Sequence, residues 1–198
     1  AATLSTAPHT LALNGADYFR FNDLTFNGTG GTYALVCHLW NGADNNMFTN
    51  CTFNAPANGT STTQVPFSIS GSATSATAVG VSGNNNIITG CTMFSGYYNT
   101  TLVGASATPN TGNQVINCNI LDQNLYGIYC SNQNGAIIRG NNLSRPTRTV
   151  LNTYYGIYVI GTSSNMLVEK NTIRNTYATA PSTTGTTYNI YCTIDATS

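Results

Sequence analysis

The sequence contains very little charge. Only 6% of its 198 residues are Asp, Glu, Lys or Arg, and six basic residues balance six acidic ones, so the formal net charge is zero. A typical soluble domain carries about 25% charged residues. Nucleic-acid binding needs a dense Lys/Arg surface, which this composition cannot supply. We therefore expect no nucleic-acid partner, and we expect neutral polar groups to keep the protein in solution.

Long apolar runs are also missing. No 18 consecutive residues are apolar, so the sequence predicts no membrane-spanning helix. The start of the chain, Ala1 to Leu4, is not a basic segment followed by an apolar one, so it does not read as an export signal. What the chain has in abundance is Thr, Asn, Ser and Gly, arranged in a repeat.

A short phrase recurs six times: an apolar residue, two variable residues, a small or amide residue, a polar residue and a second apolar residue. Repeats of 20 to 50 residues are typical of solenoids, propellers and arrays, in which each unit buries its apolar face only against its neighbours. The alternation of apolar and polar residues indicates strands rather than helices. The six copies start at Phe21, Phe48, Ile88, Val115, Ile138 and Val168.

A second alternating phrase follows each copy of the first. We align it as Tyr33 to Cys37, Val65 to Ile69, Tyr98 to Leu102, Tyr126 to Cys130, Tyr155 to Val159 and Tyr188 to Cys192, with an earlier copy at His9 to Leu13. The intervening segments are rich in Gly, Pro, Ser, Thr and Asn and are expected to be surface loops. The longest are residues 54–64, 70–86, 105–114, 144–153 and 175–187.

These phrases predict an all-β protein, a right-handed parallel β-helix of about six to seven coils without a substantial helix. A propeller blade needs four strands in about 40 to 50 residues, whereas most spacings here are shorter and show two firm strands. We expect residues 1–198 to form one β-helix module cut from a longer chain. No capping helix is evident at either end, so neighbouring domains or another chain are expected to cover the ends of the solenoid.

Six cysteines fall on two repeat positions rather than in a disulfide pattern. Cys51, Cys91 and Cys118 share the fourth position of the first phrase with Leu24, Asn141 and Asn171, and Cys37, Cys130 and Cys192 share the last position of the second. In-register side chains on parallel strands point the same way rather than towards each other, which disfavours a disulfide. We predict free thiols in two inward columns, with Asn141 and Asn171 hydrogen-bonding along theirs.

The repeat resembles that of right-handed parallel β-helix proteins, the superfold shared by pectate lyases and many surface proteins. Segments such as Asn14 to Tyr18, Ser131 to Asn142 and Gly161 to Asn165 are also similar to repeat modules of large bacterial surface proteins exported by type IX secretion. This resemblance implies a secreted or cell-surface location. It does not fix an activity, because the same scaffold carries lyases, hydrolases, epimerases and adhesins.

The enzymes that this fold resembles need carboxylates or an acidic calcium site with a basic residue. Glycosidases place two carboxyl groups about 5 to 9.5 Å apart. The candidate catalytic residues here are Asp122, Arg145 and Glu169. We interpret them instead as parts of exposed cross-strand ion pairs, Asp122 with Arg145 and Glu169 with Arg139.

Metal and cofactor binding have little support in the sequence. Asp17 and Asp44 occupy equivalent turn positions one coil apart, so a calcium ion between them is a possible exception to our expectation of no cofactor. His9 and His38 lack the spaced partners of a metal site.

The tyrosines give the strongest functional hint. Tyr129, Tyr158 and Tyr191 occupy the outward middle position of the second phrase on three consecutive coils, and another tyrosine precedes each by three residues. Such a flat stripe of rings is either a structural ladder of stacked tyrosines or a platform for sugar rings. We therefore expect a non-catalytic module that serves as a structural spacer or as an adhesion surface, with a polysaccharide or cell-surface glycan as the partner. The alternative is a polysaccharide lyase or glycoside hydrolase acting in a groove.

Overall fold

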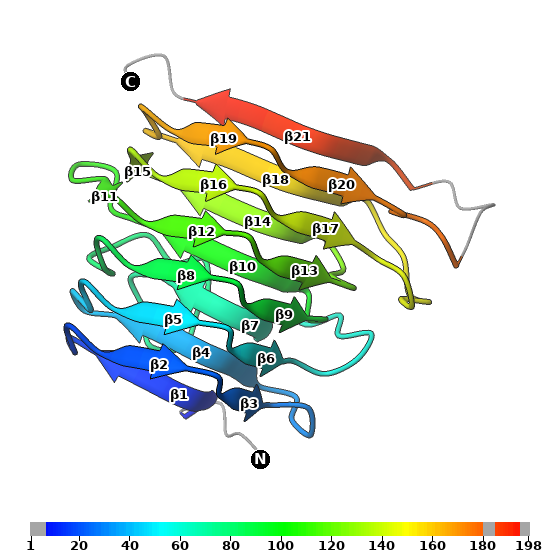
Figure 1. Cartoon of the computed structure of the whole chain (residues 1–198), viewed down its shortest axis with the longest axis horizontal. Coiled ribbons are helices and arrows are strands. Elements are labelled where there is room, and N and C mark those ends of the chain that lie inside the picture. Colours follow the sequence, from blue (N-terminus) through cyan, green and yellow to red (C-terminus); the bar gives the residue numbers. More distant parts are fainter. Residues whose placement is uncertain (1–6, 180–184, 195–198) are drawn as a thin grey trace.

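The computed structural model of the chain describes residues 7–179 and 185–194. The predicted loop at residues 175–187 therefore falls partly outside the described residues. Within them every regular element is a strand, and no helix is long and apolar enough to cross a membrane. Figure 1 shows the strands stacked as coils from the N-terminal to the C-terminal end.

Three parallel sheets run along the whole solenoid. The seven-stranded one, called the long sheet, contains β1 (His9–Asn14), β4 (Ala34–Trp40), β7 (Gln64–Ile69), β10 (Tyr98–Val103), β14 (Tyr126–Ser131), β18 (Tyr154–Gly161) and β21 (Thr187–Ile194). The second sheet contains β2 (Arg20–Asn22), β5 (Met47–Thr49), β8 (Ile87–Thr89), β12 (Gln114–Ile116), β16 (Ile137–Arg139) and β19 (Leu167–Glu169).

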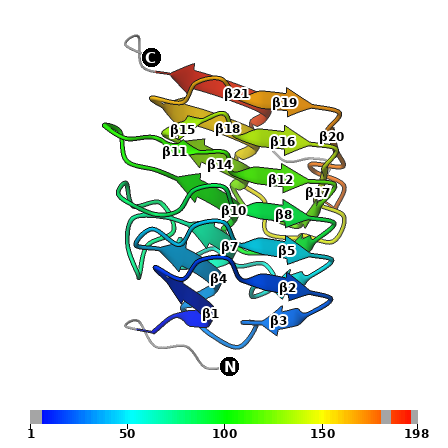
Figure 2. The same cartoon turned by 60° about the vertical axis from the view of Figure 1, so that its left-hand side comes forward.

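The third sheet contains β3 (Thr25–Asn27), β6 (Thr52–Asn54), β9 (Thr92–Phe94), β13 (Asn119–Leu121), β17 (Asn142–Ser144) and β20 (Thr172–Arg174). A short extra pair, β11 (Asn110–Thr111) and β15 (Gln133–Asn134), lies at one corner. Each coil passes through the long, second and third sheets in turn, so the described chain makes six coils and begins a seventh with β21 (Figure 2). The predicted parallel β-solenoid is confirmed.

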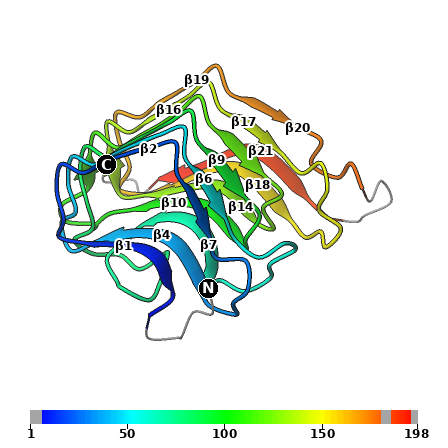
Figure 3. The same ribbon diagram turned by 60° about the horizontal axis from the view of Figure 1, so that its bottom comes forward.

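The first phrase forms two strands because it bends at its third residue. That residue has a positive φ in every coil: Asp23, Asn50, Gly90, Asn117, Gly140 and Lys170. Gly and Asn adopt this left-handed conformation at the lowest cost. The bend separates the second sheet from the third (Figure 3). The apolar residues on either side of it pack in one core.

The core is built from columns of equivalent residues. The first apolar residues of the phrase pair in register from Phe21 to Val168, and the second from Phe26 to Ile173. Between the two columns lie the buried thiols of Cys51, Cys91 and Cys118. The exception is Leu24 of the first coil, which is 44% exposed rather than buried.

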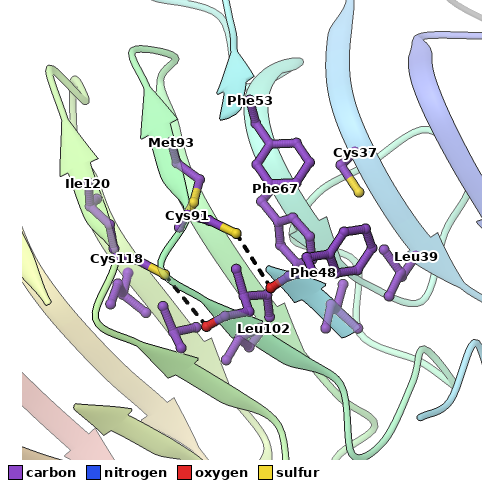
Figure 4. Close-up of a cluster of buried hydrophobic side chains, with 14 of the residues drawn as sticks. Cys37, Leu39, Phe48, Phe53, Phe67, Cys91, Met93, Leu102, Cys118 and Ile120 are labelled. Atoms are coloured by element: carbon purple, nitrogen blue, oxygen red, sulfur yellow. Dashed lines mark hydrogen bonds between the residues drawn. The ribbon is translucent and has the colours of Figure 1, made fainter. Parts of the chain in front are cut away.

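All six cysteines are free, as predicted. The Cys91 and Cys118 thiols each donate to the backbone carbonyl of a core residue, Phe48 and Ile88, at 3.5 Å (Figure 4). Burial raises the pKa of the Cys37 thiol well above its ordinary value and that of Cys130 to about 12, so both remain protonated. These thiols act as small apolar core residues.

The second cysteine column was wrong at one position. Cys130 and Cys192 share a column, but Cys37 pairs with Phe67 and so belongs to the neighbouring inward column. The phrase of that coil therefore runs from Leu35 to Leu39, two residues later than our alignment. The sequence misled because Tyr33 resembles the tyrosine that opens the later copies.

Asparagines hydrogen-bond along the solenoid in two buried places. Asn141 Nδ2 donates to Asn171 Oδ1 at 3.0 Å, which confirms the amide column of the first phrase. A second ladder, not foreseen from the sequence, joins the residues that precede β5, β8 and β12. It consists of Asn46, Asn86 and Asn113, all fully buried.

Candidate functional site

The outward face of the long sheet has one covered half and one open half. Over β4, β7 and Thr101 of β10 it is covered by the loop between β7 and β8, which lies below β1 and β4 in Figure 3. Ala76 of this loop packs against Leu35 and Val65, and its carbonyl accepts a hydrogen bond from Ser68 at 3.4 Å. The outward side chains beneath the loop are consequently buried.

Beneath this loop lie the two histidines. Their rings are 5.3 Å apart, and each also contacts the Trp40 ring. They are neighbours because His9 and His38 occupy adjacent outward columns on successive coils, a relationship that their separate sequence contexts concealed. Burial lowers the pKa of His38 to about 3, so its ring is neutral.

The contact between His38 and Ser70 resembles that of a serine nucleophile with its histidine base, but its hydrogen bond runs in the opposite direction. His38 Nε2 lies 2.9 Å from Ser70 Oγ, and both residues are fully buried. The Ser70 hydroxyl donates to the carbonyl of Ser75 at 2.6 Å, so the histidine nitrogen is the donor in their contact. The hydroxyl is therefore neither activated nor accessible.

Over β14, β18 and β21 the same outward face carries six tyrosines. We call this group the tyrosine face. The tyrosines of β14 and β18 are half-buried, and Tyr188 and Tyr191 are 38% exposed on β21, where every residue is exposed. The members are Tyr126 and Tyr129 of β14, Tyr155 and Tyr158 of β18, and Tyr188 and Tyr191 of β21.

Two tyrosines of one strand reach the same face because two successive residues between them face the core. In β14 these are Gly127 and Ile128, both buried. A Cβ at Gly127 would lie 2.5 Å from the carbonyl oxygen of Gly156 in the next coil and 2.7 Å from Leu143 Cδ2, so the close approach of the neighbouring backbone favours glycine there. The rings of Tyr126 and Tyr129 consequently pack against each other, with centroids 5.1 Å apart.

The rings also contact each other between coils. Centroids are 4.8 Å apart for Tyr155 and Tyr188, 5.4 Å for Tyr126 and Tyr155, and 5.7 Å for Tyr129 and Tyr158. Neighbouring ring planes are parallel within 13° in the first pair but inclined by 57° and 66° in the other two. The expectation of a flat stripe is therefore wrong, because the ring planes tilt between β14 and β18.

Asp122 and Arg145 do not form the predicted exposed ion pair. Both are buried, and the Asp122 carboxylate accepts hydrogen bonds from the Thr147 and Arg148 N–H groups at 2.9 Å and from the Thr147 hydroxyl at 2.6 Å. It thus anchors the loop that follows β17. The sequence could not reveal this, because alternation along strands says nothing about how a loop folds back.

The two arginines of this loop also bind backbone groups. Arg145 donates to the carbonyls of Thr176 and Asn124, and its guanidinium lies between the rings of Tyr154 and Tyr177, 4.4 and 4.7 Å from their centroids. Burial lowers its pKa below the ordinary value. The cation is held in a structural role rather than presented to a substrate.

Arg148 ties distant loops together. Its Nη2 atom donates to the carbonyl of Gly59 at 2.7 Å, 89 residues away, and its Nη1 atom donates to the carbonyl of Asp122 at 2.9 Å. Asn58 Oδ1 accepts the N–H of Thr149 at 3.0 Å in the same region. The loop after β17 therefore braces the loops of earlier coils.

Glu169 lies elsewhere. It ends β19 in the second sheet, where its carboxylate forms the predicted ion pair with Arg139 at 3.7 Å. Asp122 follows β13 in the third sheet, two coils earlier. The three catalytic candidates therefore do not share one site.

The turn aspartates stack one coil apart, as predicted. Asp17 Oδ1 accepts the N–H of Asp44 at 2.7 Å, and Asp44 Oδ1 accepts the N–H of Asn84 at 2.6 Å. Each carboxylate thus satisfies a backbone donor of the next coil. Within residues 7–179 and 185–194, no three His, Cys, Asp or Glu side chains gather as a metal site would require.

The fold defines a class of protein, the parallel β-solenoid. The sequence matches the family model described as right handed beta helix region over residues 9–194. The chain therefore belongs to the right-handed β-helix family. No curated protein and no solved structure matches the sequence.

Proposed function

We propose that this protein is a non-catalytic β-helix module of a secreted or cell-surface protein and that it binds a glycan on its tyrosine face. One observation carries the proposal: the outward face of the long sheet is covered over its early coils and left open where six tyrosines gather. Large aromatic surfaces left in contact with water are typical of binding sites.

Tyrosine suits this task physically. Its ring offers an apolar surface to the C–H groups of a sugar, and its hydroxyl can exchange hydrogen bonds with sugar hydroxyls. The rings of the tyrosine face already pack against one another, with centroids about 5 Å apart within β14 and β18. Because they are ordered before binding, little side-chain entropy is lost on contact with a ligand.

The arrangement of the catalytic candidates supports a non-catalytic role. Asp122 is buried, and its carboxylate accepts three hydrogen bonds from the loop after β17. Glu169 forms an ion pair with Arg139 on the second sheet. A glycosidase needs two carboxyl groups on either side of one bond. Neither residue is available for that role in this arrangement.

The test is binding to a panel of neutral and acidic glycans, with Tyr158→Ala as the variant. Aromatic contacts contribute about 0.5–1.5 kcal/mol each, so we expect roughly a two- to tenfold loss of affinity. The matched control is Tyr33→Ala, which removes an exposed ring outside the tyrosine face. Unchanged binding by Tyr158→Ala would overturn the proposal.

The same panel tests the enzymatic alternative. Unsaturated products and new reducing ends are followed over time with the unaltered protein, Asp122→Asn and Glu169→Gln. We expect no turnover of any glycan. If the unaltered protein turns over a glycan and either substitution abolishes that turnover, the protein is an enzyme rather than a non-catalytic binding module. Circular dichroism checks whether the Asp122→Asn variant is still folded.

A further inference from the structure

Resting on the proposed function, we propose that the ligand of the tyrosine face is a single, soluble, uncharged polysaccharide chain that lies lengthwise along the solenoid axis. Three properties of the face lead to this ligand. They are the direction of the tyrosine columns, the lack of charge among their neighbours and the tilt between their rings.

The direction follows from the register of the strands. Tyr126 pairs with Tyr155, which pairs with Tyr188, so these rings form one column along the axis. Tyr129, Tyr158 and Tyr191 form the second column beside it. A chain lying along the columns meets new rings at each coil, whereas a chain lying across them meets two.

The covering loop sets one end of this track. Tyr98 extends the first column by one coil, stacking on Tyr126 with centroids 5.1 Å apart. In the second column the position before Tyr129 is Thr101, which is buried and donates to the Ser68 hydroxyl beneath the loop. The first column thus spans four strands, or about 14 Å at the usual strand spacing.

The chemistry of the face is uncharged. Its outward neighbours on β14, β18 and β21 are Ser131, Ile160 and Thr193. Burial raises the pKa of the Tyr126 and Tyr129 hydroxyls above their ordinary value, so the phenols stay neutral. An acidic chain would lose water around its carboxylates here without gaining a cationic partner, which is unfavourable.

The nearby cations do not change this balance. Arg145, which lies over the Tyr154 ring, and Arg148 are both buried in the loop after β17, where their guanidinium groups donate to backbone carbonyls. Arg139 lies on the second sheet and pairs with Glu169. The face therefore selects against anionic chains by leaving their charge unpaired.

The tilt of the rings favours a single polysaccharide chain over the flat surface of a crystalline polymer as the ligand. Between β14 and β18 the ring planes are inclined by 57° for Tyr126 with Tyr155 and by 66° for Tyr129 with Tyr158. A flat polymer surface would rest on only part of such an array. One chain can rotate about its glycosidic bonds from sugar to sugar and follow the tilt.

The experiment compares neutral oligosaccharides of increasing length with acidic oligosaccharides and with an insoluble crystalline polymer. We expect affinity for one neutral series to rise with length and then level off, and to change less than twofold between low and high salt. Stronger, salt-sensitive binding of the acidic series would overturn the uncharged ligand. Preferential retention on the crystalline polymer would overturn the single chain.

A charge variant adds a gain of function. Thr193 is an exposed outward residue beside Tyr191, and Thr193→Lys places a cation on the edge of the face. We expect it to increase binding of acidic oligosaccharides about two- to fivefold at low salt. The matched control, Thr172→Lys, places the same charge on the third sheet and should not. An equal increase in acidic-oligosaccharide binding by both variants would contradict the placement of the ligand on the tyrosine face.

The two proposals can fail separately. If no soluble or insoluble glycan binds, or if binding is indifferent to Tyr158→Ala, the glycan-binding function itself fails. If a glycan binds through Tyr158 but is acidic, crystalline or indifferent to chain length, only the lengthwise neutral ligand is wrong.

Discussion

Replacing Asn86 by alanine should be among the most damaging single substitutions in this protein. Asn86 is the middle rung of the buried asparagine ladder. Its Oδ1 atom accepts the N–H of Asn46 at 3.0 Å, and its Nδ2 atom donates to the carbonyl of Ala43 at 2.9 Å. The two amide side chains also meet, with Asn46 Nδ2 3.1 Å from Asn86 Oδ1.

The expected cost comes from the groups left behind. Alanine would deprive the buried Asn46 N–H of its acceptor and the Ala43 carbonyl of its side-chain donor. A buried polar group without a partner costs about 1–3 kcal/mol, so two such groups predict a loss of about 2–6 kcal/mol. Because whole domains are stable by only about 5–15 kcal/mol, the variant should unfold at a much lower urea concentration.

The assay is urea unfolding followed by far-ultraviolet circular dichroism. The control is Asn119→Ala, which removes an exposed amide from a similar contact, in which Asn142 Nδ2 donates to Asn119 Oδ1 at 3.2 Å. Water can replace that partner, so we expect a change below about 0.5 kcal/mol. Equal losses in the two variants would refute the reasoning that buried amides hold the coils in register.

Two further predictions concern stability. Lys170 has a φ of 55° at the bend where the other coils carry Asp, Asn or Gly. Lys170→Gly should therefore raise the free energy of unfolding by about 0.5–1 kcal/mol, and a loss in urea unfolding would contradict this account. Burial raises the pKa of Tyr98 and of Tyr154 to about 12. Since an unfolded phenol titrates near pH 10, their neutral forms stabilise the fold below pH 10, and this stability should vanish as the pH rises from about 10 to about 12. Tyrosinate absorbance and circular dichroism recorded together check this, and phenols that all titrate near pH 10 in an intact fold would argue against it.

The repeat predicted most of the fold because a solenoid places equivalent residues at equivalent depths. The phrases from Phe21 to Val168 predicted the core columns, their register and the free thiols, but not the bend that divides each phrase into two strands. The alignment of the second phrase was wrong in one coil, where Tyr33 resembles the tyrosine that begins the later copies. The buried ladder through Asn86 was missed, although a sequence signal existed, because Asn46, Asn86 and Asn113 each directly precede a strand of the second sheet.

The site was harder to predict, since it depends on loops. The alternation of residues placed Tyr129, Tyr158 and Tyr191 on the outward side, but it could not show that the loop after β7 covers the same face of earlier coils. The burial of Asp122 and Arg145 likewise results from the path of the loop after β17. Loop residues lack the periodicity that reports depth, so their contacts appear only in three dimensions.

The central claim is that the uncovered tyrosine face is the surface that meets the ligand. The most direct measurement is a ring-proton NMR titration of the tyrosine-labelled protein with a glycan that it retains. The account predicts shifts in the ring signals of Tyr126, Tyr129, Tyr155, Tyr158, Tyr188 and Tyr191, with those of Tyr18 and Tyr33 unchanged. Shifts confined to Tyr18, Tyr33 or Tyr177, with the six rings of the face unmoved, would contradict it.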